Sequence, residues 1–112
     1  MPLLAAGTLA VGCDRAGPYR IGVVLDDDGF RAASLAAEQV NADGGINGHR
    51  LELRNIGGAG STKARVALET AERLATDPNI LAVVGHTNSS ASLAASQVYN
   101  MRHVAQIAPT ST

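Results

Sequence analysis

Cysteine, aromatic residues and net charge are all scarce in this sequence of 112 residues. It has one cysteine and no Trp, aromatic residues make up 3%, and the formal net charge is −1. A single cysteine excludes an internal disulfide, and the near-balanced charge provides no basic surface for nucleic acid. No apolar stretch is long enough to span a bilayer as a helix. The length allows one small domain at most, with a core built mainly from Ala, Val, Leu and Ile.

The chain begins with an uncharged, apolar segment. Residues 1–12 resemble the apolar part of a secretory signal, and a polar turn follows Cys13 at once. The run Leu-Ala-Val-Gly-Cys at residues 9–13 resembles a bacterial lipobox, whose cysteine is lipidated and becomes the first mature residue. We therefore expect a signal peptide over residues 1–12, lipidation at Cys13 and a lipidated linker over residues 13–18. An N-terminal strand with a buried thiol is the alternative.

Apolar strands and amphipathic helices alternate along the rest of the chain. Near-continuous apolar runs predict strands covered on both faces, whereas residues 51–56 alternate at first, as a strand at a sheet edge does. Segments with apolar residues at helical spacing separate these runs. The predicted strands are residues 19–25, 51–56, 80–84 and 104–107, and the predicted helices are residues 30–41, 63–75 and about 90–100.

This alternation predicts an α/β fold with a doubly wound parallel sheet, because crossovers between parallel strands are right-handed. With residues 51–56 at the edge, the predicted strand order is 2-1-3-4. Gly44 and Gly45 follow the first helix, where a left-handed residue ends a helix well. Ser61 or Thr62 is placed to cap the second helix.

Three polar segments meet at the end of the predicted sheet where the strands have their carboxyl ends. Ligands of such sheets bind outside the carboxyl ends of the strands, at the point where the strand order reverses. That point lies between the first and third strands. The segments beside it are residues 26–29, 85–89 and 110–112.

The segment of residues 87–90 opens a helix and is rich in hydroxyl and amide groups. Helix N-termini offer N–H groups and a partial positive charge to an anion. No Asp or Glu occurs from residue 78 to residue 112. A carboxylate or a phosphate would suit this place. The alternative, which is common at helix starts, is that Asn88 or Ser89 serves only as the N-cap, and the residues alone leave both open.

An enzyme is the competing hypothesis. An apolar strand followed by Asp26, Asp28 and a glycine resembles the first motif of haloacid-dehalogenase-like phosphatases, with Asp26 as nucleophile and Asp28 as general acid. That chemistry needs further carboxylates for Mg²⁺, which the later strands do not supply. A solvated acidic turn is the favoured interpretation. We expect His86 to be a hydrogen-bonded scaffold residue, His49 and His103 to be solvated, and no metal site.

Several segments together resemble the type I periplasmic binding proteins, in particular the branched-chain amino acid-binding group that serves ABC transporters. Residues 35–48 look like that family's first helix and its Asn-x-x-Gly-Gly-Ile-x-Gly turn. Residues 82–90 look like its third strand and ligand loop, and residues 106–112 like the end of its next strand. The resemblance implies a two-lobed fold that closes over an amino acid and passes it to a membrane permease, without catalysis or a cofactor.

The resemblance also implies roles for individual residues. Ser89 would hold the ligand carboxylate through its hydroxyl and amide, and Thr87 would line the site with its backbone. Thr110 would offer its carbonyl to the ligand ammonium, and Thr112 would bind the ammonium and carboxylate region. The loop of residues 26–29 is shorter than the family's glycine-rich loop, so its contact with the ligand side chain is left open.

We interpret residues 19–112 as the N-terminal part of lobe I of a lipid-anchored, extracytoplasmic substrate-binding protein. We expect the chain to be a fragment that lacks the second lobe and that binds ligand weakly or not at all by itself. A ligand-sensing domain of a signalling receptor with the same fold is the alternative of a different class.

Overall fold

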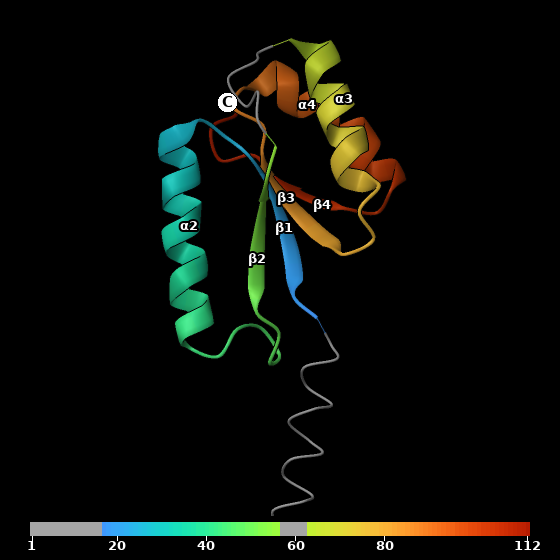
Figure 1. The fold of residues 1–112 in the computed structure, drawn as a ribbon. Coiled ribbons are helices and arrows are strands. Elements are labelled where there is room, and N and C mark those ends of the chain that lie inside the picture. Colours follow the sequence, from blue (N-terminus) through green and yellow to red (C-terminus); the bar gives the residue numbers. More distant parts are fainter. Residues whose placement is uncertain (1–16, 57–62) are drawn as a thin grey trace, which may run out of the picture.

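The computed structural model describes residues 17–56 and 63–112. Four strands and three helices alternate along this part of the chain (Figure 1). The strands are β1 (Tyr19–Val24), β2 (Leu51–Asn55), β3 (Ile80–Gly85) and β4 (Ala105–Ile107). The helices are α2 (Asp27–Ala42), α3 (Ala64–Ala75) and α4 (Ser89–Met101). The predictions for residues 1–16, including Cys13, and for Ser61 and Thr62 lie outside the described residues.

The four strands form one sheet in the order β2-β1-β3-β4. All three pairings are parallel, and Val23 in β1 lies opposite Asn55 in β2 and Val84 in β3. The predicted α/β class, parallel sheet and strand order are therefore confirmed. Because the strands are parallel, the segments that follow β1, β3 and β4 leave the sheet at the same end, beyond the carboxyl ends of the strands. We call this end the carboxyl edge of the sheet.

Helices cover both faces of the sheet, with α2 on one face and α3 and α4 together on the other (Figure 1). The core lies mainly between the sheet and the α3–α4 pair, where Leu74, Val83, Ala95 and Tyr99 are almost completely buried. Gly22 allows this close approach, since a Cβ atom there would lie 3.0 Å from the side chain of Leu74. The α3–α4 face is thus a close-packed apolar layer.

The α2 face is packed more openly. Ala37 is the buried residue of α2, and a groove of about 490 Å³ runs between the helix and the sheet. Its walls are apolar, and residues that follow the carboxyl ends of the strands also line it. These residues are Asp26 after β1, Thr87 after β3 and Thr110 after β4.

Helix α2 begins earlier than the sequence pattern predicts. We expected residues 26–29 to form a loop, but the helix starts at Asp27. Asp26 is its N-cap, with a carboxylate oxygen that accepts a hydrogen bond from the amide of Gly29 at 2.8 Å. Asp27 and Asp28 occupy the first turn, where the positive end of the helix dipole favours carboxylates. Gly44 follows the other end of the helix with φ of 101°, as predicted.

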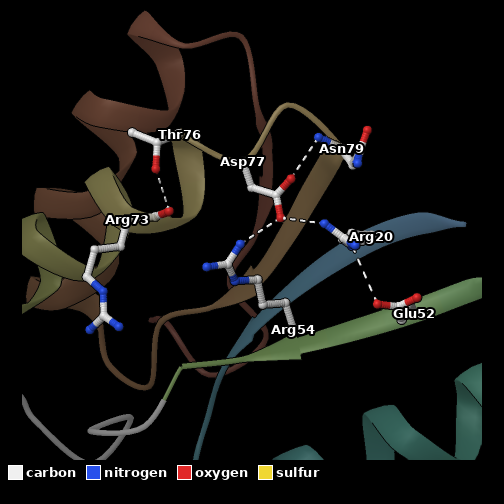
Figure 2. Close-up of polar contacts among 7 residues, drawn as sticks. All are labelled: Arg20, Glu52, Arg54, Arg73, Thr76, Asp77 and Asn79. Atoms are coloured by element: carbon white, nitrogen blue, oxygen red, sulfur yellow. Dashed lines mark hydrogen bonds and ion pairs between the residues drawn. The ribbon is translucent and has the colours of Figure 1, made fainter.

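Asp77, which precedes β3, is buried among charged groups that tie β1, β2 and the α3–β3 connection together (Figure 2). Its carboxylate accepts hydrogen bonds from Arg54 at 2.6 Å, from Arg20 at 3.2 Å and from the amide of Asn79 at 2.9 Å. Arg20 also pairs with Glu52 at 3.4 Å. The Asn79 amide, helped by the two arginines, holds the pKa of Asp77 below its ordinary value of 3.8, although burial opposes this. We call these five residues the Asp77 cluster.

None of the helices in the described ranges is long and apolar enough to cross a membrane.

Candidate ligand-binding site

The first turn of α4 is held by Asn88. The side-chain oxygen of Asn88 accepts a hydrogen bond from the amide of Ala91 at 2.8 Å. The backbone carbonyl of Asn88 accepts one from the amide of Ser92 at 2.9 Å. The sequence left either Asn88 or Ser89 as the N-cap, and the structure gives this role to Asn88. Ser89 is therefore the first helical residue, and its hydroxyl does not serve as the cap.

Ser89 instead contacts the segment after β4. Its hydroxyl donates a hydrogen bond to the carbonyl of Thr112 at 3.2 Å and accepts one from the Thr112 amide at 3.0 Å. Figure 1 places the C-terminus beside the start of α4, in agreement with these contacts. Two of the four predicted site residues, separated by 23 positions, are thus in direct contact.

The other two predicted residues form a second link across the same edge. The Thr110 hydroxyl donates a hydrogen bond to the Thr87 carbonyl at 2.6 Å. All four predicted residues therefore join the loop after β3 and the start of α4 to the segment after β4. The amides of Ser89 and Ser90 open the helix and have no acceptor within it, so they present donors at its positive end.

The charges around this edge are unevenly distributed. Residues 78–112 contain no Asp or Glu, so the start of α4 meets an approaching anion with neutral donors alone. Asp26 lines the same groove as Thr87 and Thr110 and is exposed. The α4 side of the edge therefore suits a negative group, and the α2 side suits a positive one.

His86 lies directly behind the site and is almost completely buried. Its Nε2 atom is 2.9 Å from the hydroxyl of Tyr99, which is also buried. Burial lowers the pKa of His86 to about 4 and raises the pKa of Tyr99, so both groups are neutral at physiological pH. The predicted scaffold role of His86 is confirmed.

His49 differs from its prediction. We expected it to be solvated, but it is half-buried and stacks on the ring of Tyr19 at a centroid distance of 4.0 Å. Its Nδ1 atom is 2.8 Å from the carbonyl of Gly17. Among the residues of known placement, no three His, Cys, Asp or Glu side chains are grouped so as to hold a metal ion.

Sequence reasoning missed a second set of polar residues, which lies behind the predicted ones. Ser92 and Ser111 are joined by a hydrogen bond of 3.0 Å, and the Gln106 amide donates to the carbonyl of Gly85 at 3.0 Å. The one available signal was Ser92 itself, a polar residue between Ala91 and Ala95 on the face of the helix predicted to be apolar.

The sequence matches a known family over most of its length. Residues 8–112 match the family described as periplasmic binding protein. The chain belongs to this family. Together with the sheet order, this confirms the resemblance to type I periplasmic binding proteins, and it implies a location outside the cytoplasm.

Individual members of the periplasmic binding protein family show how much of such a protein the chain represents. An amino acid binding protein of Pseudomonas aeruginosa is 43% identical over 83 residues, which are 74% of this chain and 22% of the relative. The leucine-, isoleucine-, valine-, threonine-, and alanine-binding protein of the same organism is 36% identical over 110 residues, 97% of this chain and 28% of the relative. The chain thus spans about a quarter of the length of these relatives.

A solved structure agrees with the sequence matches. The ABC transporter substrate-binding protein from Desulfitobacterium hafniense, in complex with Leu, superimposes with a TM-score of 0.77 at 29% identity. The superposition covers 85% of this chain and 29% of that chain. The relatives are binding proteins rather than enzymes. Neither these matches nor the capping role of Asp26 favours the phosphatase hypothesis.

Proposed function

We propose that this chain contributes one wall of the ligand site in the substrate-binding component of an ABC transporter. The ligand is an amino acid of the branched-chain type, held by its carboxylate at Ser89 and Thr112. The observation that carries the proposal is the direct contact between these two residues at the start of α4. The amino acid ligands of the relatives support the choice of ligand.

The carboxylate binds by replacing an internal hydrogen bond. The Ser89 hydroxyl donates a hydrogen bond to the Thr112 carbonyl in this structure. Rotation of this hydroxyl turns its hydrogen towards a carboxylate placed over the first turn of α4, where the Ser89 amide also donates. The lost bond is a neutral one worth about 1 kcal/mol, whereas a hydrogen bond to a charged group contributes about 1.5–3 kcal/mol. The exchange therefore favours an anionic ligand.

The ammonium group binds on the other side of the site. The Thr110 carbonyl and the Thr112 side chain accept its hydrogen bonds, and the Thr87 backbone lines the space between them. Asp26, on the rim of the same groove, adds electrostatic attraction for the positive group. An amino acid zwitterion thus meets donors with its negative end and acceptors with its positive end.

Binding is non-covalent, and the function is delivery of the ligand to a membrane permease rather than catalysis. The lipid anchor at Cys13 keeps the protein at the outer face of the cytoplasmic membrane. The rest of the ligand enclosure comes from a second lobe, as the greater length of the relatives suggests. With one wall alone, the affinity is expected to be weak, with a dissociation constant on the order of 1 mM or above.

Titration of the ¹⁵N-labelled chain with L-leucine, followed by NMR, tests the proposal. We expect the amide signals of Ser89, Ser90 and Thr112 to shift with increasing leucine. L-leucinamide, which lacks the carboxylate, is expected to leave them in place. Equal shifts with both compounds, or no shift at these amides with leucine, would refute carboxylate binding at the start of α4.

A further inference from the structure

Ser92 occupies a central position behind the proposed site. It lies on α4, three residues after Ser89, and is 6% exposed. Its hydroxyl accepts hydrogen bonds from the amide of His86 at 3.0 Å and from the hydroxyl of Ser111 at 3.0 Å. It donates one to the carbonyl of His86 at 3.1 Å. A serine hydroxyl has one hydrogen and two lone pairs, so these contacts use its whole hydrogen-bonding capacity.

The partners of Ser92 are the neighbours of the proposed ligand residues. His86 directly precedes Thr87, and Ser111 lies between Thr110 and Thr112. One buried hydroxyl therefore joins the loop after β3 and the segment after β4 to the helix that carries Ser89. The contacts of Ser89 and Thr110 across this edge are exposed, whereas those between Ser92 and His86 are buried.

Gln106 connects β4 to the same place. Its side-chain amide donates hydrogen bonds to the carbonyl of Ser92 at 3.2 Å and to the carbonyl of Gly85 at 3.0 Å. Ser92 thus contacts the adjoining elements through both its side chain and its backbone. Within the described residues, no buried side-chain nitrogen or oxygen lacks a hydrogen-bond partner, so this network is complete.

We infer that Ser92 is a positioning residue for the ligand site. It fixes the Thr87 loop and the segment of residues 110–112 relative to Ser89, and does not itself bind the ligand. The inference rests on the proposed function for the identity of the ligand. Its geometric part, the ordering of the two segments by one hydroxyl, is measurable without leucine.

The test compares Ser92→Ala with Ser96→Ala in the complete chain. Ser96 is a matched control, because it lies one helical turn further along α4 and its hydroxyl donates a hydrogen bond to the carbonyl of Leu93 in the same helix at 2.6 Å. In Ser92→Ala we expect amide hydrogen exchange at His86 to become faster by about tenfold or more, because a buried donor loses its acceptor. The heteronuclear NOE of residues 110–112 is expected to fall. Ser96→Ala should leave both measurements at the wild-type level.

Two further variants separate positioning from general destabilisation. Ser92→Thr keeps the hydroxyl and is expected to restore the His86 and Thr112 signals. Ser111→Ala removes the hydrogen bond between the Ser111 and Ser92 hydroxyls. It should lower the heteronuclear NOE of Thr112 and leave the His86 amide protected from hydrogen exchange. The amide of Leu74, in the core on α3, serves as the reference for global unfolding.

The possible outcomes distinguish this inference from the proposed function. If residues 110–112 have the same heteronuclear NOE in Ser92→Ala as in the wild type, the positioning role is overturned, whether or not leucine binds. A wild-type spectrum that leucine leaves unchanged would overturn the proposed ligand, while the exchange and NOE data still decide the positioning role. If both hold, Ser92→Ala should weaken leucine binding by about tenfold, as expected when an ordered pair of binding groups is released.

Discussion

Two polar regions of the described structure are built from different kinds of groups. The Asp77 cluster, near the amino end of β3, pairs full charges, and its carboxylate is buried between two arginines. The region at the carboxyl ends of the strands consists of hydroxyls and amides around Ser89, Ser92 and Thr112. In the Asp77 cluster the charged groups neutralise one another. The other region offers neutral donors that an outside charge can use.

The difference has an energetic meaning. A buried carboxylate between arginines is costly to separate from its partners, because an unpaired buried charge remains. A hydroxyl gives up a neutral hydrogen bond at a cost of only about 1 kcal/mol. The Asp77 cluster is therefore suited to fixing strands together, and the hydroxyl region is suited to changing partners when a ligand arrives.

Asp77→Asn tests the stabilising role of the charged region and should have the largest effect. The change leaves Arg20 and Arg54 without their shared carboxylate, and we expect a loss of about 2–4 kcal/mol in the free energy of unfolding. Urea denaturation measures it at neutral pH. Because the folded pKa of Asp77 is lowered, its contribution is complete above the unfolded pKa and is lost as the pH falls through the folded value. The difference from the wild type should therefore shrink in acid.

Glu69→Gln is the control for this experiment. Glu69 pairs with Arg65 on the surface of α3 at 3.2 Å, and both side chains are largely exposed. Its removal is expected to cost about 0.5 kcal/mol or less. Equal losses for Asp77→Asn and Glu69→Gln would contradict the role of the Asp77 cluster in fixing the strands together.

His86 makes the hydroxyl region sensitive to acid. Its pKa falls from 6.5 to about 4 on folding, so the unfolded chain binds a proton in this range that the folded chain excludes. The contribution of His86 to the free energy of unfolding is complete above pH 6.5. It falls as the pH decreases towards 4, by roughly 1–3 kcal/mol. His86→Gln, which does not titrate, should lack this part of the pH profile of unfolding. An identical slope in the variant and the wild type would show that His86 is already charged or exposed in the folded chain.

Asn88→Ala tests the N-cap of α4. Loss of the acceptor for the Ala91 amide is expected to cost about 1 kcal/mol of stability and to fray the turn that carries Ser89. Gln97→Ala, at an exposed position of the same helix, should cost about 0.5 kcal/mol at most. Thermal unfolding of both variants checks the prediction, which fails if the two costs are alike.

Ser89→Ala should have the smallest effect on stability. Its hydroxyl contacts are exposed, so we expect a loss of about 0.5 kcal/mol. The same change should abolish the leucine-dependent shift of the Thr112 amide, since the group proposed to hold the carboxylate is gone. A large loss of stability with leucine binding intact would reverse the roles assigned to the two polar regions.

The sequence predicted the sheet well, because each strand is a short apolar run bounded by turn residues. It also predicted the meeting of Ser89 with Thr112, since a parallel sheet brings the carboxyl ends of neighbouring strands together. The predicted start of α2 is three residues too late, because the sequence pattern of Asp26, Asp27 and Asp28 indicates a turn. The same acidic residues are favourable in a cap and a first helical turn.

Contacts between distant elements were beyond the reach of sequence patterns. Arg20, Arg54 and Asp77 come from β1, β2 and the α3–β3 connection, and nothing in their spacing indicates that they meet. The role of Ser92 depends likewise on the position of Ser111, which becomes evident only when β4 is placed beside β3. Local signals specify caps and strands, whereas the packing of elements specifies these polar networks.

Intermolecular NOEs between ¹³C-labelled leucine and the chain test the central claim most directly, since they locate the ligand on the protein. The account predicts NOEs from the leucine α proton to the amides of Ser89 and Thr112 at the start of α4. NOEs confined to Ala33 and Ala36, in the apolar groove beside α2, would contradict it.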